Sequence, residues 1–173
     1  VCSSDLYRFV SRSKKPFNVV DETVDYRFPS DMVASVPYVK AGKDGDYESQ
    51  YFNSFENTYT TDRLSKLNKK RLMFLPLVVD AGEGVKICIT ESGLENYPGL
   101  YLSAAEGEKR LTGQFAPYPK KTVQGGHNQL QMLVKEREAY IAKVDNPRSF
   151  PWRMSIVTTS DKDLAARSEE HTS

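Results

Sequence analysis

Apolar residues in this chain recur at every second position over short runs, and this pattern constrains the fold more than any other feature. In VVDETVDYRF (residues 19–28), Val20, Val24 and Tyr26 fall on alternate positions, and Glu22 belongs to the same series. Alternation of this kind, in runs rich in β-branched and aromatic residues, is typical of strands. Comparable runs follow in DMVASVPYV (31–39), RLMFLPLVVD (71–80), GVKICIT (84–90) and FPWRMSIVTT (150–159). Many short strands separated by turn residues predict a mostly β fold, a β-sandwich of two layers.

Between these runs the sequence predicts turns and one long connection. AGEG (81–84) separates two apolar runs and predicts a hairpin. NQLQMLVKEREAYIAKV (128–144) is ambiguous, and we expect a strand in its second half and a short helical turn around residues 130–134. The segment 42–70 is polar, rich in aromatic residues and without clear period. A connection of that length in a compact domain is either functional or an elaborated loop.

The two ends of the chain do not read as protein. RSEEHTS (167–173) can be encoded by a nucleotide string whose reverse complement encodes VCSSDL (1–6), and that string resembles a common sequencing adapter. We therefore set residues 1–6 and 167–173 aside as adapter-like and assign residues 7–166 to a partial β-sandwich domain. We expect this window to be a piece of a longer open reading frame.

Removing the two ends changes the charge balance only slightly. Asp5, Arg167, Glu169 and Glu170 lie in them, so the 24 basic and 23 acidic residues become 23 and 20, a net charge of +3. This excess is too small to indicate nucleic acid or an anionic membrane surface as a partner. No run approaches the roughly 18 apolar residues of a membrane helix.

Cysteine and histidine are scarce between residues 7 and 166. Cys88 is the one cysteine there, and its apolar neighbours indicate a small buried side chain rather than a nucleophile. His127 is the one histidine, which argues against a catalytic triad or a histidine-rich zinc site within the window. No pair of carboxylates is set off by its context as a general acid and base.

The run KICIT ends on a carboxylate, Glu91, just before the turn residues of SGLENYPG. A carboxylate fixed at a strand end is a suitable ligand for a hard cation such as Ca²⁺, which takes oxygen donors. Spacing alone favours the simpler alternative, a surface glutamate that caps the amides of the turn.

Two further features admit two interpretations each, and a third leads to one expectation for each of two residues. The aromatic residues of segment 42–70 either border a carbohydrate cleft or pin the segment to the sandwich, and we favour the second. QGGHNQ (124–129) brings His127 and Asn128 onto a glycine-rich backbone that a ligand can approach, although such a segment is more often a plain turn. In FPWR we expect Trp152 to pack in the core and Arg153 to pair with a carboxylate.

The order of the segments resembles the N-terminal domain of family 97 glycoside hydrolases over nearly all of residues 7–166. Most of the specificity comes from two motifs, a strand ending in Thr-Glu before an L-x-x-Y-P-G turn, and a late Pro-Trp-Arg strand. The matching segments are VDYRFPSD, VPYVK, YESQYFNSFENTYT, FLPLVVDAGEGVKICITESGLENYPGLYL, FAPYP, QGGHNQLQMLV, YIAK and FPWRMSIVTTSDKDL.

The resemblance implies an exported or periplasmic bacterial enzyme with an N-terminal β-super-sandwich, a (β/α)₈ barrel and a C-terminal β domain. Such enzymes hydrolyse α-glucosides or α-galactosides and depend on Ca²⁺. By resemblance, Glu91 is one calcium ligand, while the other ligands and both catalytic carboxylates lie in the barrel, outside this chain. Tyr118, His127 and Asn128 are candidate substrate contacts from the sandwich side. We therefore expect residues 7–166 to be non-catalytic and to pack on the barrel in cis.

The competing hypothesis is a free-standing carbohydrate-binding or structural sandwich with no catalysis. It predicts a stop codon or a linker soon after DKDL, whereas the enzyme hypothesis predicts further sandwich strands and then a barrel. In the structural version, Glu91 is merely a turn residue.

Overall fold

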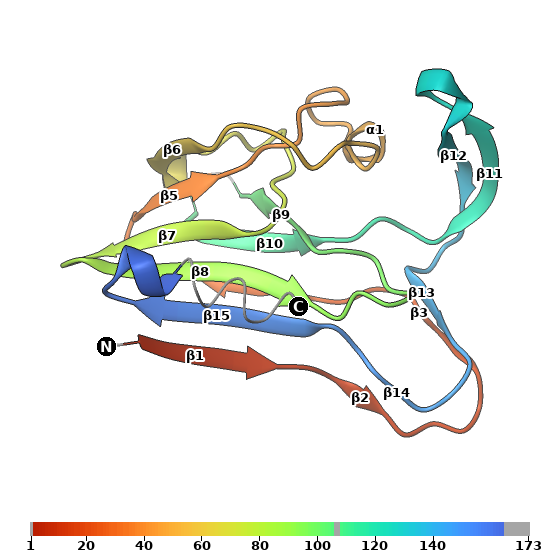
Figure 1. The fold of residues 1–173 in the computed structure, drawn as a ribbon, viewed down its shortest axis with the longest axis horizontal. Helices are drawn as coiled ribbons and strands as arrows, with labels where there is room; N and C mark the ends of the chain where they lie inside the picture. The colour runs from red at the N-terminus through yellow and green to blue at the C-terminus, as the bar shows by residue number, and fades with distance from the viewer. Residues whose placement is uncertain (1, 106–107, 165–173) are drawn as a thin grey trace.

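A computed structural model describes residues 2–105 and 108–164 of the chain. Its main layer is a six-stranded antiparallel sheet in the order β1-β15-β8-β7-β5-β6. In Figure 1 this sheet runs from β1, at the bottom, through β15 and β8 to β5 and β6. The strands of the sheet are β1 (Cys2–Tyr7), β5 (Val33–Val36), β6 (Thr60–Arg63), β7 (Leu77–Gly82), β8 (Val85–Ser92) and β15 (Trp152–Thr158).

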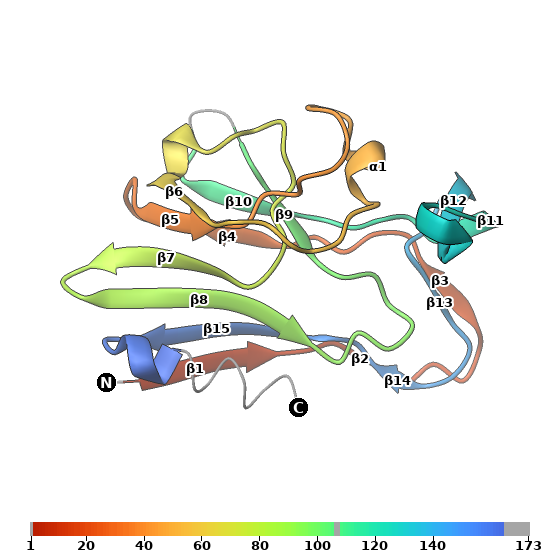
Figure 2. The same ribbon diagram turned by 45° about the horizontal axis from the view of Figure 1, so that its top comes forward.

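A second, three-stranded sheet in the order β4-β10-β9 lies against the first, as Figure 2 shows. Its strands are β4 (Asp25–Arg27), β9 (Tyr101–Ala104) and β10 (Arg110–Gln114). The core between the sheets draws Val36, Val79 and Ile89 from the first and Leu102 and Leu111 from the second, each fully buried. The predicted mostly β, sandwich-like architecture is confirmed.

The remaining elements are short. Three two-stranded ribbons pair β11 with β12, β13 with β3 and β14 with β2. Their bounds are β2 (Val10–Ser11), β3 (Phe17–Val19), β11 (Pro119–Gly125), β12 (Gln131–Arg137), β13 (Ala142–Val144) and β14 (Arg148–Ser149). The helical turns are α1 (Tyr47–Gln50), η1 (Leu64–Lys66) and η2 (His127–Gln129). No helix among the described residues has the length and apolar character needed to span a membrane.

The strongest periodic runs fold as predicted. β7 and β8 form the hairpin expected at AGEG, with Leu77 opposite Ile89. FPWRMSIVTT supplies β15, whose alternate residues Met154 and Ile156 are buried. Cys88 is buried at 2% exposure, as its apolar neighbours predicted.

Two segments have a secondary structure that differs from the prediction. The run 19–28 is not one strand, because β3 ends at Val19 and β4 begins at Asp25, with residues 20–24 between them. The helical turn expected around residues 130–134 is wrong: Gln131–Arg137 is strand β12, and the helical turn η2 precedes it at His127–Gln129. Pairing with β11 across the ribbon overrides the helical composition of the segment.

Of the two adapter-like ends, residues 167–173 lie outside the described residues. At the other end, Cys2–Tyr7 form β1 and pair along β15, from Cys2 opposite Thr158 to Tyr7 opposite Arg153. An edge strand presents unpaired N–H and C=O groups that accept an extended segment with little demand on its sequence. The edge of β15 is therefore sufficient reason for these residues to be extended.

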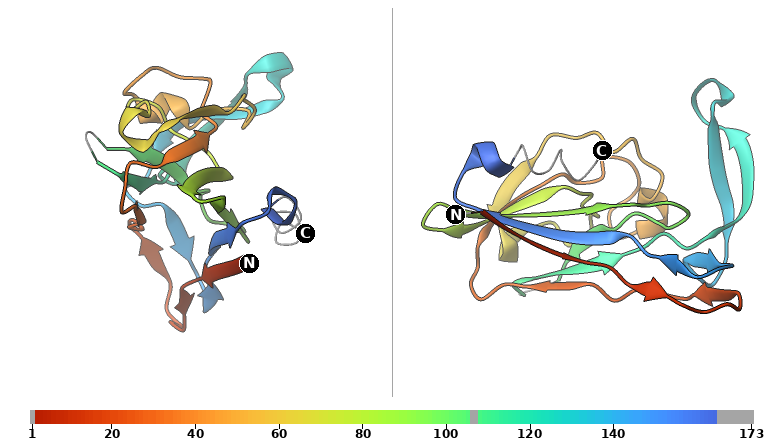
Figure 3. Two further views of the ribbon diagram at one scale, coloured as in Figure 1. Left: turned by 90° about the vertical axis from the view of Figure 1, so that its left-hand side faces the viewer. Right: turned by 60° about the horizontal axis from the view of Figure 1, so that its bottom comes forward.

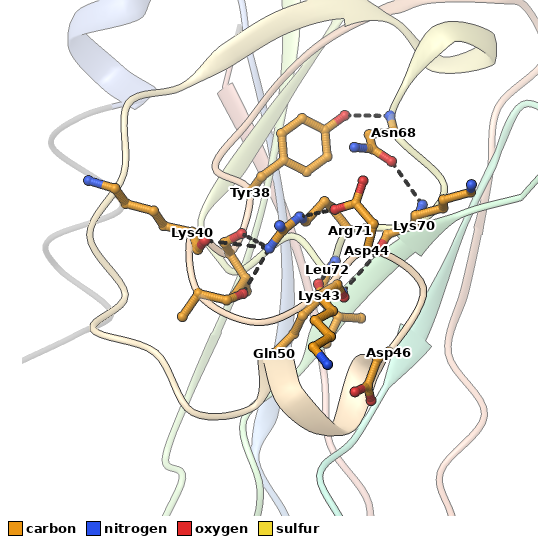
Figure 4. Close-up of polar contacts among 12 residues, drawn as sticks. Tyr38, Lys40, Lys43, Asp44, Asp46, Gln50, Asn68, Lys70, Arg71 and Leu72 are labelled. Carbon is orange, nitrogen blue, oxygen red and sulfur yellow. Dashed lines mark hydrogen bonds and ion pairs between the residues drawn. The ribbon is translucent and has the colours of Figure 1, made fainter. Parts of the chain in front are cut away.

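The long segment 42–70 is held in place by a buried glutamine. Gln50 is fully buried at the end of α1, and its amide nitrogen donates to the carbonyl oxygens of Lys43 (2.8 Å) and Lys70 (2.9 Å). Its carbonyl oxygen accepts from the Leu72 amide at 2.8 Å. Figure 4 shows this network beside Arg71. The Arg71 side chain pairs with Asp44 and donates a hydrogen bond to the carbonyl oxygen of Ala41.

Aromatic residues complete the attachment of the segment. Phe55 stacks on Tyr101 and meets Phe74 edge-on, and Tyr51 contacts Tyr101 from another side. Phe55 remains 58% exposed despite these contacts. The aromatics thus pin the segment to the sandwich, as favoured from the sequence, while leaving part of their surface open.

The β11–β12 ribbon projects from one end of the sandwich, most clearly in the right-hand view of Figure 3. Leu130 and Met132, near its tip, are 81% and 59% exposed. The ribbon is therefore an arm rather than a part of the core.

Candidate functional site

Glu91 lies near the end of β8, directly opposite Arg153 of the neighbouring strand β15. Directly opposed side chains in an antiparallel pair lie close together on the same face. Nη1 of Arg153 donates to Oε2 of Glu91. The Arg153 side chain is only 1% exposed and the Glu91 side chain 10%. The register of the two strands thus creates a nearly buried ion pair.

A second carboxylate reaches the same guanidinium from the connection between β3 and β4. Nε of Arg153 donates to Oε1 of Glu22, and Nη2 donates to Oε2, each at 2.9 Å. This is the two-pronged geometry in which a guanidinium binds a carboxylate most strongly. The hydroxyl of Tyr97 also donates to Oε2 of Glu22 at 2.9 Å, and the ring of Phe115 lies 5.3 Å from Cζ of Arg153.

The turn after β8 approaches Glu91 through its backbone. The Leu100 amide donates to both carboxylate oxygens, at 2.9 Å to Oε1 and 3.1 Å to Oε2. A Cβ atom added to Gly99 would lie 3.3 Å from Oε1, so the absence of a side chain there keeps space beside this oxygen. Glu91 does cap an amide of the turn, but from a largely buried position rather than from the surface.

Burial decides the direction of the pKa shift of Glu91, and it is outweighed at Arg153. It raises the pKa of Glu91 to about 7, although the charge of Arg153 and the hydrogen bond from Leu100 act in the opposite direction. For Arg153, burial favours the neutral form, but the hydrogen bonds and charges of Glu22 and Glu91 outweigh it and raise the pKa. Arg153 is therefore a permanent cation between two carboxylates.

Each carboxylate borders a different surface hollow. Glu91 lines one of about 410 Å³, together with Phe55, Leu94, Gly99 and Tyr101. Glu22 lines another of about 470 Å³, whose wall includes Phe9, Phe17, Tyr97 and Phe150. Both hollows are mainly apolar, so each carboxylate is a polar group in an apolar wall.

The residues present can contribute to a calcium site but do not form a complete one by themselves. Oε1 of Glu91 accepts a single hydrogen bond, from Leu100, and an ionised carboxylate oxygen has further acceptor capacity. Together with the space that Gly99 leaves, this suits one oxygen donor to a cation. Ca²⁺ takes about 6–8 oxygen ligands, however, and residues 2–105 and 108–164 contain no group of three or more His, Cys, Asp or Glu arranged to hold a metal. A shell with several carboxylate ligands would therefore take the others from outside these residues.

The three residues predicted to contact substrate do not lie together. Tyr118 precedes β11 at the base of the projecting ribbon, where its ring lies 5.6 Å from Tyr140 and 5.1 Å from Nζ of Lys143. His127 and Asn128 form η2 at the far end, about 20 Å away by the rise of a strand. Asn128 has a φ of 52°, in the left-handed region that asparagine tolerates.

The two expectations for the Pro-Trp-Arg strand have different outcomes. Arg153 does pair with carboxylates, as predicted. Trp152 is only partly buried, so its placement in the core is wrong; the guanidinium of Arg8 lies over its ring at 4.4 Å. β15 begins with the partly buried Trp152, and the next two residues, Arg153 and Met154, are both buried.

Sequence reasoning missed the part of Glu22 and Tyr97 in the cluster. One signal for Glu22 was present, because it occupies the same alternating series as the buried Val24. A carboxylate in an apolar series needs a buried cation as a partner. Tyr97, within the L-x-x-Y-P-G turn, had no comparable signal.

Two features define the class of this protein. The chain is a β-sandwich, and it places the Thr-Glu strand end and the Pro-Trp-Arg strand side by side, joined through a buried ion cluster. Both features agree with the domain that the order of the segments resembles. The chain belongs to the family described as Glycosyl-hydrolase 97 N-terminal, which it matches over residues 6–169.

Relatives agree with this assignment. A retaining alpha-galactosidase from Bacteroides thetaiotaomicron is 79% identical over 160 residues, which are 92% of this chain and 24% of the relative. The chain thus spans about a quarter of the length of this curated relative. A family 97 glycoside hydrolase from Pseudoalteromonas sp. strain K8, solved with acarbose, superposes with a TM-score of 0.60 at 15% identity, over 93% of this chain and 20% of that one. A beta-arabinopyranosidase superposes with a TM-score of 0.56 at 15% identity, over 91% and 23%.

Proposed function

We propose that this chain is the non-catalytic N-terminal part of a calcium-dependent glycoside hydrolase that acts on α-galactosides or, as the second candidate, on α-glucosides. In this proposal the sandwich packs on a catalytic (β/α)₈ domain of the same polypeptide and supplies Glu91 to the calcium shell. The observation that carries the proposal is the set of contacts around Glu91: a nearly buried carboxylate fixed by Arg153 and Leu100, with space beside Oε1.

The substrate class is supported by similarity over this domain. The relative that is 79% identical is described as a retaining alpha-galactosidase. We therefore place α-galactosides ahead of α-glucosides and propose retention of the anomeric configuration. In retaining enzymes one carboxylate attacks the sugar and the other serves as acid and then base, with the two groups about 5–5.5 Å apart. Glu22 and Glu91 are unsuited to these roles, because both are committed to Arg153.

Calcium, when bound, would position and polarise the reacting groups of the catalytic domain. The residues of this chain would hold the Glu91 ligand in place for the cation. Arg153 and the Leu100 amide hold the Glu91 carboxylate in one orientation, and Gly99 keeps Oε1 accessible. The apolar wall around Glu91 limits competing water.

The proposal has three secondary parts. Tyr118, His127 and Asn128 would approach the catalytic domain through the projecting ribbon and contact substrate there. The full-length protein would be exported or periplasmic, with a signal peptide upstream of this chain. The isolated chain would have no hydrolytic activity. The alternative, a free-standing carbohydrate-binding sandwich, loses support because the relative is about four times as long as the matched segment.

The central experiment replaces Glu91 with Gln in the full-length protein. Glu95→Gln is the matched control, because Glu95 is an exposed carboxylate four residues further along in the same turn. Calcium affinity is measured by isothermal titration calorimetry, and turnover with a nitrophenyl α-galactoside. We expect Glu91→Gln to weaken both and Glu95→Gln to leave both unchanged. Wild-type calcium affinity in Glu91→Gln would overturn the ligand assignment.

A further inference from the structure

Arg153 divides its donors unequally between its two carboxylates. Two nitrogens, Nε and Nη2, go to Glu22, and only Nη1 goes to Glu91. Glu22 therefore accepts two parallel hydrogen bonds from the guanidinium, and Glu91 accepts one, from the remaining nitrogen. The more complete neutralisation of the guanidinium comes from Glu22.

With Glu91 ionised, the three side chains together carry one net negative charge. If Glu22 were absent, Arg153 and Glu91 would form an isolated neutral pair, and the guanidinium would be free to take both oxygens of Glu91. A cation approaching Glu91 would then meet an unbalanced positive charge within hydrogen-bonding distance of its ligand. With Glu22 present, that positive charge is already balanced.

We propose that Glu22 is a positioning residue for calcium: it neutralises Arg153 and so leaves the charge of Glu91 available to the cation, without ligating the cation itself. This inference rests on the proposed function of Glu91. Glu22 is less suited than Glu91 to be the ligand, because both of its oxygens accept from the Arg153 guanidinium and Tyr97 donates to one of them, whereas Oε1 of Glu91 accepts only from a neutral amide. It also borders the hollow lined by Phe9 and Phe17, whereas Glu91 borders the hollow lined by Phe55 and Leu94.

The structure holds Glu22 firmly in this role. Tyr97 donates to Glu22 and is itself packed between Phe115, at 6.3 Å, and Phe150, at 5.5 Å. Tyr97 and Leu100, which donates to Glu91, belong to the same turn. The segment SGLENYPGL therefore secures both carboxylates, one through a side chain and the other through the backbone.

The size of the effect follows from the charge that is removed. A unit charge several ångströms away in surroundings of effective dielectric constant about 20 changes an interaction enough to shift a binding constant by roughly tenfold or more. We expect Glu22→Gln to weaken calcium binding by at least about tenfold. Asp21→Asn removes the same charge one residue away from an exposed side chain and is expected to change affinity less than about threefold, because screening reduces its effect.

The test uses the full-length protein and two readouts, the calcium dissociation constant from isothermal titration calorimetry and the calcium-dependent shift in melting temperature. In the double variant Glu22→Gln/Arg153→Gln, Glu91 regains an uncompensated charge but loses one of the two donors that orient it, so affinity should recover in part and exceed that of Glu22→Gln. A purely structural role for Glu22 would predict that the double variant binds no better than Glu22→Gln. Should Glu22→Gln fail to fold, Glu22→Asp is the second variant: it keeps the charge beside Arg153, so its calcium affinity should stay within about threefold of wild type, and a loss of about tenfold would overturn the charge argument.

The results separate this inference from the proposed function. Loss of calcium binding in Glu91→Gln together with wild-type affinity in Glu22→Gln would overturn the role of Glu22 and leave Glu91 as a ligand. Unchanged affinity in Glu91→Gln would overturn the function itself. Weakening in Glu22→Gln without recovery in the double variant would also overturn the charge-balance argument.

Discussion

Replacing Arg153 with Met tests how much the fold depends on the buried cluster. The substitution keeps most of the side-chain volume but leaves Glu22 and Glu91, whose side chains are only 9% and 10% exposed, without their cation. Removing one partner of a buried pair costs about 3–5 kcal/mol because the remaining charge is uncompensated. For a chain of this size, with a urea m-value near 2 kcal/mol/M, this loss of unfolding free energy lowers the urea concentration at the midpoint by roughly 2 M.

Trp152 provides the assay, because it is the single tryptophan of the chain and lies next to Arg153 in β15. Its fluorescence reports urea unfolding of the strand that carries the substitution. Lys86→Met is the control, since Lys86 pairs with Asp161 at the surface of the same sheet, with exposures of 31% and 77%. An exposed pair contributes about 0–1 kcal/mol. Equal losses in the two variants would refute the reasoning.

The pH dependence of the Arg153→Met loss provides a second check. Burial already raises the pKa of Glu91 to about 7, and removing the charge of Arg153, which lowers that pKa, should raise it further. A carboxyl whose folded pKa exceeds its unfolded value takes up a proton on folding. Its contribution to stability is therefore full at low pH and is lost as the pH rises through the folded pKa. The deficit should be larger at pH 8 than at pH 5, and a deficit independent of pH would contradict this account.

Three further predictions concern residues outside the cluster. Gln50→Met should destabilise the chain by about 2–3 kcal/mol in urea unfolding, because it removes one buried hydrogen bond, from Leu72, and two partly buried ones, to Lys43 and Lys70. Gly42→Ala should cost clearly more than Gly45→Ala: both glycines have a φ near 80°, but only at Gly42 would a Cβ lie 2.6 Å from backbone atoms. Cys88, whose burial raises the pKa of the thiol to about 11, should resist iodoacetamide at pH 8 until urea is added, as peptide mass spectrometry would show.

Strands were predictable where local pattern and tertiary pairing agree. The β7–β8 hairpin and β15 follow from alternation and turn residues, because alternate apolar residues of these strands are buried. The segment 128–144 was not predictable in detail, because its composition suits a helix and only the pairing of β12 with β11 makes it extended. Residues 19–28 lost their continuity for a similar reason: the chain passes from the ribbon with β13 to the second sheet within that stretch.

Part of the candidate site was also predictable. Glu91 was a candidate from its place at a strand end, where spacing favoured a turn cap and the family resemblance a calcium ligand, and Arg153 was expected to pair with a carboxylate. Their mutual contact depends on the register of β8 and β15, which a single sequence does not state because 61 residues separate the two positions. The part played by Glu22 depends on the path of the connection between β3 and β4, which has no periodic pattern to predict it.

The sequence by itself determined the class of fold, the β7–β8 hairpin and two of the charged residues of the cluster, because alternation, turn residues and charge are local properties. The tertiary structure alone decided which charges meet. It brought a carboxylate from a loop and another from a strand to one arginine, where burial makes their interaction strong. The sequence offered Glu91 as an isolated strand-end carboxylate, and the structure made it one corner of a cluster whose net charge is set by Glu22.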